Sequence, residues 1–139
     1  EENNFYYKTV GIWHKTNPMP RNMNLHFVNS TEAWVYFINE GTTGTFNNKN
    51  KVLHDFIESS LTTQSEKKFG KHPTQKPIDV LNHFTKVLSN EGDVVCDPFM
   101  GSGSTGVSCE MNNRQFIGIE LNEEYYNISK NRIQDITIK

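Results

Sequence analysis

The segment Asp97-Pro-Phe-Met-Gly101-Ser-Gly103-Ser-Thr-Gly106 decides the fold of this chain. Residues 93–97, which lead into it, form a short, mostly apolar run that is typical of a buried strand, and the small residues of 102–111 predict a helix. Glycines in such a loop let the backbone approach a ligand closely, and the first N–H groups of the helix point at that ligand. The sequence therefore predicts a strand, a ligand-binding loop and a helix in succession.

The segments on either side extend this unit into an α/β pattern. Upstream, apolar residues recur at helical spacing from Ile78 to Leu88, and Pro77 suits the first turn of a helix. Downstream, residues 115–120 predict a second strand, and Asn122 is a suitable N-cap for a last helix. The order helix, strand, helix, strand, helix predicts an α/β, doubly wound arrangement for the back half of the chain.

The front half predicts a different arrangement. Residues 5–13 and 32–38 are aromatic and β-branched, so we expect two strands that pair as an antiparallel hairpin with a long connection. Residues 41–70 are rich in Thr, Asn, Ser and Lys, and only 52–57 looks ordered, as a helical turn. An irregular stretch of this length is usually functional or disordered. We interpret Trp13 and Trp34 as core residues.

Composition bounds the class of protein. The 139 residues suffice for one domain with a core, and 35% hydrophobic with 22% charged residues is typical of a globular protein. No apolar run approaches the ~18 residues that a membrane span needs. Cys96 and Cys109 lack metal-ligand spacing, so we interpret them as reduced core thiols and expect a soluble, cytoplasmic protein without a metal site.

Charge is distributed unevenly along the chain. The net charge is −2, but residues 8–76 carry +4 and residues 77–139 carry −4. This asymmetry is a modest indication that a polyanion binds the front half. Ordinary scatter of charges explains it equally well.

Two carboxylates indicate which ligand the loop binds. Glu120 ends the second strand of the back half, where a carboxylate can accept hydrogen bonds from both ribose hydroxyls of a nucleoside. Gly101, Gly103 and Gly106 match the dinucleotide fingerprint, although a tight turn with close helix packing would need the same glycines. Asp97 would repel a pyrophosphate and suit the cationic amino group of a methionine moiety; alternatively, it is a helix N-cap or turn acid. We expect Asp97 and Glu120 to face one common cavity.

Three motifs follow one another along the chain: Trp13-His-Lys-Thr-Asn-Pro-Met-Pro-Arg-Asn22, Lys71-His-Pro-Thr-Gln-Lys-Pro77 and the segment 97–106. Together they resemble the β class of DNA amino-methyltransferases, which use S-adenosylmethionine to methylate adenine N6 or cytosine N4. The resemblance covers nearly the whole chain. It departs from the family at Ser104, where threonine is usual and either residue supplies a hydroxyl. It implies part of a doubly wound, Rossmann-like methyltransferase sheet with an antiparallel hairpin.

The resemblance also implies roles for individual residues. S-adenosylmethionine would be held by the glycine loop, by the acid beside it at the ribose, and by the upstream motif: Asp97, Phe99, Gly101, Ser102, Gly103, Glu120, Thr74, Lys76 and Pro77. The chain would divide into a hairpin part (1–40), a target-recognition region (41–70) and a cofactor-binding part (71–139).

Duplex DNA with a flipped target base would be the substrate. Basic residues of the front half would contact its phosphates: Lys15, Arg21, Lys49, Lys51, Lys67 and Lys68. For Lys67 and Lys68 a solvated surface is the alternative. The run Asn17-Pro-Met-Pro-Arg21 favours adenine over cytosine by resemblance alone, and membership of a restriction-modification system is compatible with the sequence but not readable from it.

The family's catalytic motif, Asp/Asn/Ser-Pro-Pro followed by an aromatic residue, does not occur in the 139 residues. In the β class it precedes the segment seen here, and a complete sheet needs roughly 180–210 residues at ~30 per strand–helix unit. We therefore expect the C-terminal part of a methyltransferase, with no catalytic residue of its own and inactive alone. Its strand over 94–97 would show an open apolar edge until the N-terminal part or a partner chain covers it.

Three alternatives stay open at this point. The chain could be a non-catalytic subunit that binds cofactor or DNA and completes its site with a partner chain. It could be a dinucleotide-dependent oxidoreductase domain. It could also be a structural fragment whose pocket is too incomplete to bind a ligand.

Overall fold

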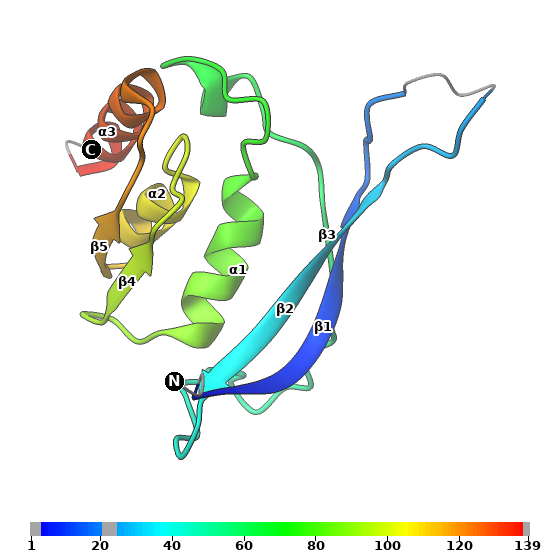
Figure 1. Ribbon diagram of the computed structural model, residues 1–139, viewed down its shortest axis with the longest axis vertical. Coiled ribbons are helices and arrows are strands. Elements are labelled where there is room, and N and C mark those ends of the chain that lie inside the picture. Colours follow the sequence, from blue (N-terminus) through cyan, green and yellow to red (C-terminus); the bar gives the residue numbers. More distant parts are fainter. Residues whose placement is uncertain (1–3, 21–24, 138–139) are drawn as a thin grey trace. The chain divides into compact units, whose positions relative to one another are not determined.

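The computed structural model describes residues 4–20 and 25–137. The chain divides into two compact units, residues 1–61 and 62–139, and each is described by itself (Figure 1). Among the described residues, no helix is long and apolar enough to span a bilayer.

The first unit is a three-stranded sheet with the order β2-β1-β3. Its strands are β1 (Phe5–Lys15), β2 (Thr31–Asn39) and β3 (Phe56–Ser59). β1 and β2 are antiparallel, with a register that shifts between Tyr7 and Thr9, so the predicted hairpin is confirmed. Figure 1 shows these two strands as a long, twisted ribbon.

The prediction of a helical turn over 52–57 is wrong, because residues 56–59 form β3, parallel to β1. Backbone bonds from Ile12 N to Asp55 O (2.8 Å) and from Thr16 N to Ser59 O (3.0 Å) extend this pairing. The indole Nε1 of Trp13 also donates to Ser59 Oγ at 2.9 Å. Contacts with a strand more than forty residues away thus decide the conformation of a segment too short to show a period of its own.

One face of this sheet is apolar and exposed. Val10 lies opposite Val35, and Ile12 opposite Phe56, while alternate residues such as Trp13 point to the other face, where Trp13 is only 4% exposed. We call this the open face of the three-stranded sheet; its exposed side chains are Tyr7, Val10, Ile12, Val35, Phe37 and Phe56.

The second unit is α/β. Its elements are the 3₁₀ turn η1 (Ser65–Lys67), α1 (Ile78–Leu88), β4 (Val94–Asp97), α2 (Ser104–Met111), β5 (Gln115–Gly118) and α3 (Glu123–Thr137). β4 and β5 are parallel, with Asp97 opposite Gly118. The predicted order of helices and strands is confirmed. With its mixed first sheet, the chain as a whole has an α/β, partial methyltransferase-like architecture.

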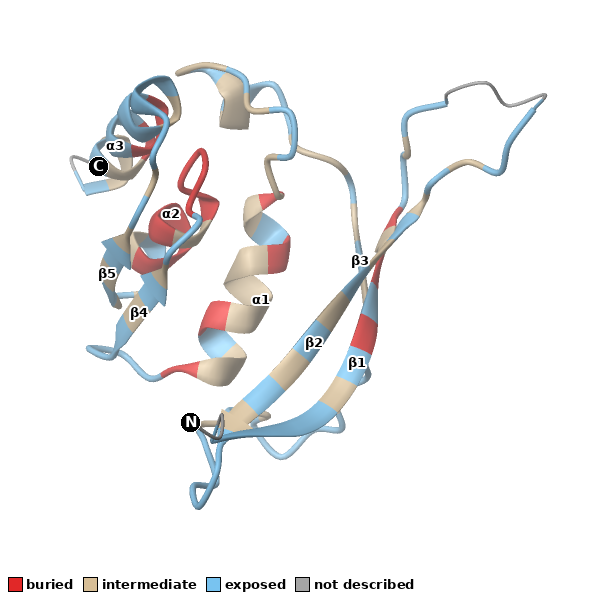
Figure 2. Ribbon diagram, in the orientation of Figure 1, coloured by how far each residue is buried: buried red, intermediate tan, exposed pale blue. Residues whose placement is uncertain are grey.

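The core of this unit surrounds α2, which packs against α1, α3 and both strands. Figure 2 shows buried residues gathered on α2 and on the loop before it. Val107 and Cys109 are almost fully buried there. The absence of a side chain at Gly106 allows close packing, because a Cβ would come within 2.6 Å of Phe116 Cε1 and would also clash with Ile133 Cδ1. Close packing of α2 on β5 and α3 therefore fixes the position at which α2 begins after the glycine loop.

The face of β4 and β5 turned away from α2 has little cover. Side chains of a parallel pair alternate between faces, and Val94, Cys96, Ile117 and Ile119 share the exposed one. We call this the outer face of β4–β5. Its exposure makes the interpretation of Cys96 as a core thiol wrong, whereas Cys109 is a core thiol as expected. Among the described residues, β4 pairs with β5 alone.

Candidate functional site

The loop between β4 and α2 depends on two glycines in left-handed conformations, Gly101 with φ 53° and Gly103 with φ 75°. A side chain at Gly101 would also press on the His72 ring, since a Cβ there would lie 3.1 Å from Nε2. A Cβ at Gly103 would lie 2.7 Å from the Cβ of Ser129. Only glycine meets both the conformational and the steric demands of these positions.

Asp97 anchors the start of this loop. Its Oδ1 accepts a hydrogen bond from the Phe99 backbone N–H at 3.0 Å, and its Oδ2 accepts one from Thr105 Oγ1 at 2.6 Å. The carboxylate is thus a turn acid, and it also lines the cavity described below. The interpretation of Asp97 as a turn acid is confirmed, and its contact with a cationic amino group stays a prediction.

Glu120 reaches the same loop from the end of β5. Its Oε2 accepts a hydrogen bond from the Gly101 N–H at 3.0 Å, and its Oε1 accepts one from the Asn122 N–H at 2.8 Å. Glu120 is not among the residues that line the cavity. The expectation that Asp97 and Glu120 face one common cavity is therefore not met, because backbone N–H groups of Gly101 and Asn122 engage both carboxylate oxygens of Glu120 beside the loop.

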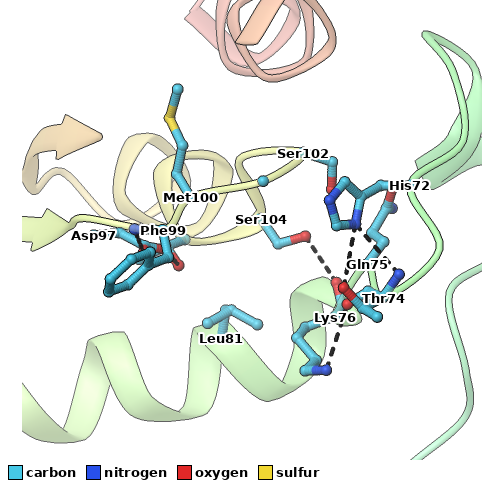
Figure 3. A pocket seen from close by; sticks show the side chains of 12 residues that line it. His72, Thr74, Gln75, Lys76, Leu81, Asp97, Phe99, Met100, Ser102 and Ser104 are labelled. Carbon is cyan, nitrogen blue, oxygen red and sulfur yellow. Dashed lines mark hydrogen bonds between the residues drawn. The ribbon is translucent and has the colours of Figure 1, made fainter. Parts of the chain in front are cut away.

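A cavity of about 190 Å³ lies between the glycine loop and the Lys71–Pro77 segment. Figure 3 shows Asp97 and Phe99 at one side of it and His72, Thr74 and Lys76 at the other. The complete lining is His72, Thr74, Gln75, Lys76, Leu81, Asp97, Phe99, Met100, Gly101, Ser102, Ser104 and Thr105. The second and third sequence motifs therefore form one site.

Hydrogen bonds and a ring contact hold the wall formed by residues 72–76. The His72 ring accepts a bond from the Thr74 N–H at 3.3 Å and packs edge-on against Tyr125, with ring centroids 4.2 Å apart. Ser104 Oγ donates to the Lys76 carbonyl at 2.8 Å, which joins this wall to the glycine loop (Figure 3). The two walls are thus one hydrogen-bonded structure.

Six of the nine predicted cofactor residues line the cavity: Thr74, Lys76, Asp97, Phe99, Gly101 and Ser102. Gly103 and Pro77 are instead the N-caps of α2 and α1. Sequence reasoning did not select six further lining residues: His72, Gln75, Leu81, Met100, Ser104 and Thr105. Five of them lie inside the two quoted motifs, so treating each motif as a continuous wall would have found them.

The predicted DNA-contacting residues have varied surroundings. Lys15 is 9% exposed, with its ammonium 3.0 Å from Glu32 and 5.5 Å from the Trp13 ring centroid. Lys68 pairs with Asp135 at 2.7 Å. The other described members are the exposed Lys49 and Lys51 and the half-buried Lys67. Arg21 lies outside the described residues. Within residues 4–20 and 25–137, no group of three potential ligands could hold a metal ion.

Comparison with known protein families identifies the family to which the chain with this site belongs. Residues 1–131 match the N6/N4 methyltransferase family model, described as DNA methylase. The chain belongs to this DNA methylase family. The resemblance inferred from the three motifs is confirmed.

Curated methylases of the family are similar over most of the chain. Type II methyltransferase M2.LlaDCHI of Lactococcus lactis subsp. cremoris is 39% identical over 130 residues, which are 87% of this chain and 48% of that protein. Type II methyltransferase M2.DpnII of Streptococcus pneumoniae is 38% identical over 131 residues, 88% of this chain and 49% of that protein. The chain spans about half the length of the curated methylases it matches.

A solved methylase structure has the same arrangement. The crystal structure of the M1.HpyAVI–SAM complex superposes with a TM-score of 0.83 at 37% identity, covering 94% of this chain and 64% of that one. That crystal structure is of the methylase in complex with S-adenosylmethionine. The partial α/β architecture of this chain corresponds to a large part of its fold.

Proposed function

We propose that the chain is the C-terminal, cofactor-binding part of a site-specific DNA methyltransferase, which uses S-adenosylmethionine to methylate N6 of adenine in duplex DNA. The observation that carries this proposal is the cavity at the carboxyl end of β4, walled by the glycine loop and by residues 72–76. Ligands of open α/β sheets bind outside the carboxyl ends of the strands, where loops of this kind lie.

The chemistry of the cavity fits this cofactor. S-adenosylmethionine carries positive charge on its sulfur and amino group, and Asp97 provides a carboxylate in the wall. Phe99, which is 89% exposed, offers an aromatic face that attracts a cation. A pyrophosphate would meet the charge of Asp97, so the same wall disfavours a dinucleotide. When bound, S-adenosylmethionine supplies a methyl group on a positively charged sulfur, and the residues of this chain bind and orient it.

The small volume of the cavity supports the proposal that residues beyond its lining complete the binding site. Pockets for drug-sized ligands usually measure about 300–1,000 Å³, and this cavity measures about 190 Å³. We propose that the cavity takes the methionine part of the cofactor. Glu120, beside Gly101 and outside the lining, would take the ribose by exchanging a backbone N–H for the ribose hydroxyls.

Two apolar sheet faces are exposed, and this exposure supports the proposal that a further part of the fold covers them. Parallel sheets are normally buried on both faces, yet the outer face of β4–β5 is exposed. The open face of the three-stranded sheet is exposed as well. We propose that the N-terminal part of the methyltransferase, on the same or a partner chain, covers these faces. That part would also supply the Pro-Pro-aromatic motif.

DNA recognition is assigned to the front half. We propose that residues 41–70 contact the target, with Lys49, Lys51 and Lys67 at the phosphates. Lys15 and Lys68 already pair with carboxylates, so they would reach phosphate only by exchanging partners. Charge reversal at Lys49 and Lys51 should therefore weaken duplex binding more than reversal at Lys15.

Calorimetry tests the cofactor. The chain should bind S-adenosylmethionine and not NAD, and Asp97→Asn should weaken binding at least about tenfold, since a charged contact is worth about 1.5–3 kcal/mol. Asp79→Asn is the matched control, because it removes the same charge from the exposed first turn of α1. Tighter binding of NAD, or equal affinities of the two variants, would overturn the assignment.

Methyl transfer to duplex DNA tests the activity. The 139-residue chain alone should incorporate no label from S-adenosylmethionine, and addition of a methylase N-terminal part that bears the Pro-Pro-aromatic motif should restore incorporation at adenine. Turnover by the chain alone, or label at cytosine N4, would contradict the proposal. A co-purifying protein with that motif would instead identify a subunit that completes its site in trans.

A further inference from the structure

The helix α3 lies directly behind the glycine loop. Ser129, Arg132 and Ile133 are spaced three and four residues apart, so they share one face of the helix. Ser129 packs against Gly103, and its hydroxyl lies 3.6 Å from the sulfur of Met100. The back of the loop is therefore held by a single helical face.

Arg132 makes the polar contacts of that face. Its side chain is 5% exposed, and its Nη1 donates to the Ser102 carbonyl at 2.5 Å. The same nitrogen lies 3.0 Å from Ser102 Oγ and 3.2 Å from Ser104 Oγ. Ser102 and Ser104 both line the cavity, and Arg132 does not. The guanidinium therefore contacts the loop from the side away from the cavity.

These bonds continue to the opposite wall. Ser104 Oγ accepts from Arg132 and donates its own hydrogen to the Lys76 carbonyl at 2.8 Å. One chain of hydrogen bonds thus runs from α3 through the glycine loop to the 72–76 segment. A change at Arg132 reaches both walls of the cavity through this chain.

We propose that Arg132 is a positioning residue: it fixes the Ser102–Ser104 part of the loop and thereby sets the affinity for S-adenosylmethionine without touching it. The inference rests on the proposed function, in which this cavity binds the cofactor.

A purely structural role explains Arg132 poorly. Burial lowers the pKa of its guanidinium, and the charge of Glu66 raises it. Arg132 also lines a second cavity of about 200 Å³. Its Nη2 atom is itself buried and has no hydrogen-bond partner among the described residues. Apolar residues of similar volume often stabilise a core as well as a buried charge does. What they cannot supply is the set of bonds to Ser102 and Ser104.

The test compares two arginines of the same unit. Arg132→Met removes the bonds to the loop. Arg114→Met is the matched control, because Arg114 donates to the carbonyl and hydroxyl of Ser89 (2.6 and 3.1 Å) and lines neither cavity. Both variants should melt at lower temperature, so each is assayed well below its Tm, by calorimetry with S-adenosylmethionine and by amide hydrogen exchange of peptides over 99–107 without ligand.

We expect Arg132→Met to weaken binding at least about tenfold and to speed exchange in the loop, while Arg114→Met changes neither by more than about twofold. Arg132→Lys, which keeps one donor, should recover part of the affinity, and it replaces Arg132→Met if the latter does not fold. Unchanged affinity and unchanged loop exchange in the Arg132 variants would overturn the inference. If the unmodified chain does not bind S-adenosylmethionine, the proposed function fails, and loop exchange still decides whether Arg132 holds the loop.

Discussion

The carboxylate of Glu120 accepts a 3.0 Å hydrogen bond from the backbone N–H of Gly101. Glu120 comes from the end of β5, and Gly101 is the left-handed glycine of the loop after β4. The bond therefore ties two neighbouring strand ends together at the place where we propose that the cofactor binds.

Glu120→Gln tests both roles of this carboxylate. The amide keeps one acceptor oxygen for Gly101 but loses the charge and the acceptor for the Asn122 N–H, so S-adenosylmethionine should bind at least about tenfold more weakly and Tm should fall modestly. Calorimetry and thermal melting measure the two effects. Glu123→Gln, on the exposed first turn of α3, is the control. Affinity equal to that of the unmodified chain would exclude a ribose contact by Glu120.

Gly106→Ala should destabilise the second unit by about 1–3 kcal/mol, which is typical of overpacking. The new methyl group would meet the Phe116 ring and Ile133 Cδ1. Urea titration followed by circular dichroism measures the loss. Ile133→Val removes one of the three atoms that would clash, so the double variant should be less destabilised than the sum of the single changes. Strict additivity would show that the contact with Ile133 is not what excludes the methyl group.

The two cysteines should react differently with maleimides. Cys96 is exposed on the outer face of β4–β5, whereas Cys109 is fully buried and burial raises its pKa to about 11. The thiolate is the reactive form of cysteine. Cys96 should therefore be labelled quickly at about pH 8, and Cys109 only in denaturant. Mass spectrometry of tryptic peptides identifies the site. Fast labelling of Cys109 in the folded chain would contradict the burial of α2.

Stability should fall below pH 6.5 partly because of His83. Burial lowers the pKa of its imidazole from 6.5, so the unfolded chain binds more protons between the folded value and 6.5. Unfolding free energy therefore rises with pH across this window and levels off above it. His83→Gln should flatten the decrease in Tm between about pH 7.5 and 5.5. An unchanged slope would show that other groups account for it.

The outer face of β4–β5 should matter for association more than for stability. Ile117→Lys changes an exposed side chain, so unfolding free energy should change by no more than about 0.5 kcal/mol. The same change should abolish restoration of methyl transfer by the N-terminal part. Thermal melting and the restored assay separate the two effects, with Lys130→Glu on the exposed side of α3 as a surface-charge control. Full restoration by the Ile117→Lys variant would show that this face stays uncovered.

Local patterns account for what the sequence predicted correctly. The apolar period over Ile78–Leu88 and the short apolar run before Asp97 identify α1 and β4, because both signals lie within a few residues. The pairing of β3 with β1 is not local, and four residues show no period that separates a strand from a turn. Similarly, a lysine in the sequence predicts an exposed cation, and the ion pair of the buried Lys15 with Glu32 of β2 is not visible in the local sequence.

The candidate site divides in the same way. The positions of Asp97 and Glu120 follow from the ends of two predicted strands, but their partners do not, because those are backbone N–H groups of a loop whose path depends on Gly101 and Gly103. The contact from Arg132 has no sequence signal near the loop, since it comes from a helix thirty residues away.

The glycine loop draws its described side-chain hydrogen bonds from β4, α2, α3, Glu120 and Lys76, all within residues 62–137. A gene rearrangement that relocated this stretch within a coding sequence would leave those bonds unchanged. The loop would therefore keep its path wherever residues 62–137 stood in a longer polypeptide.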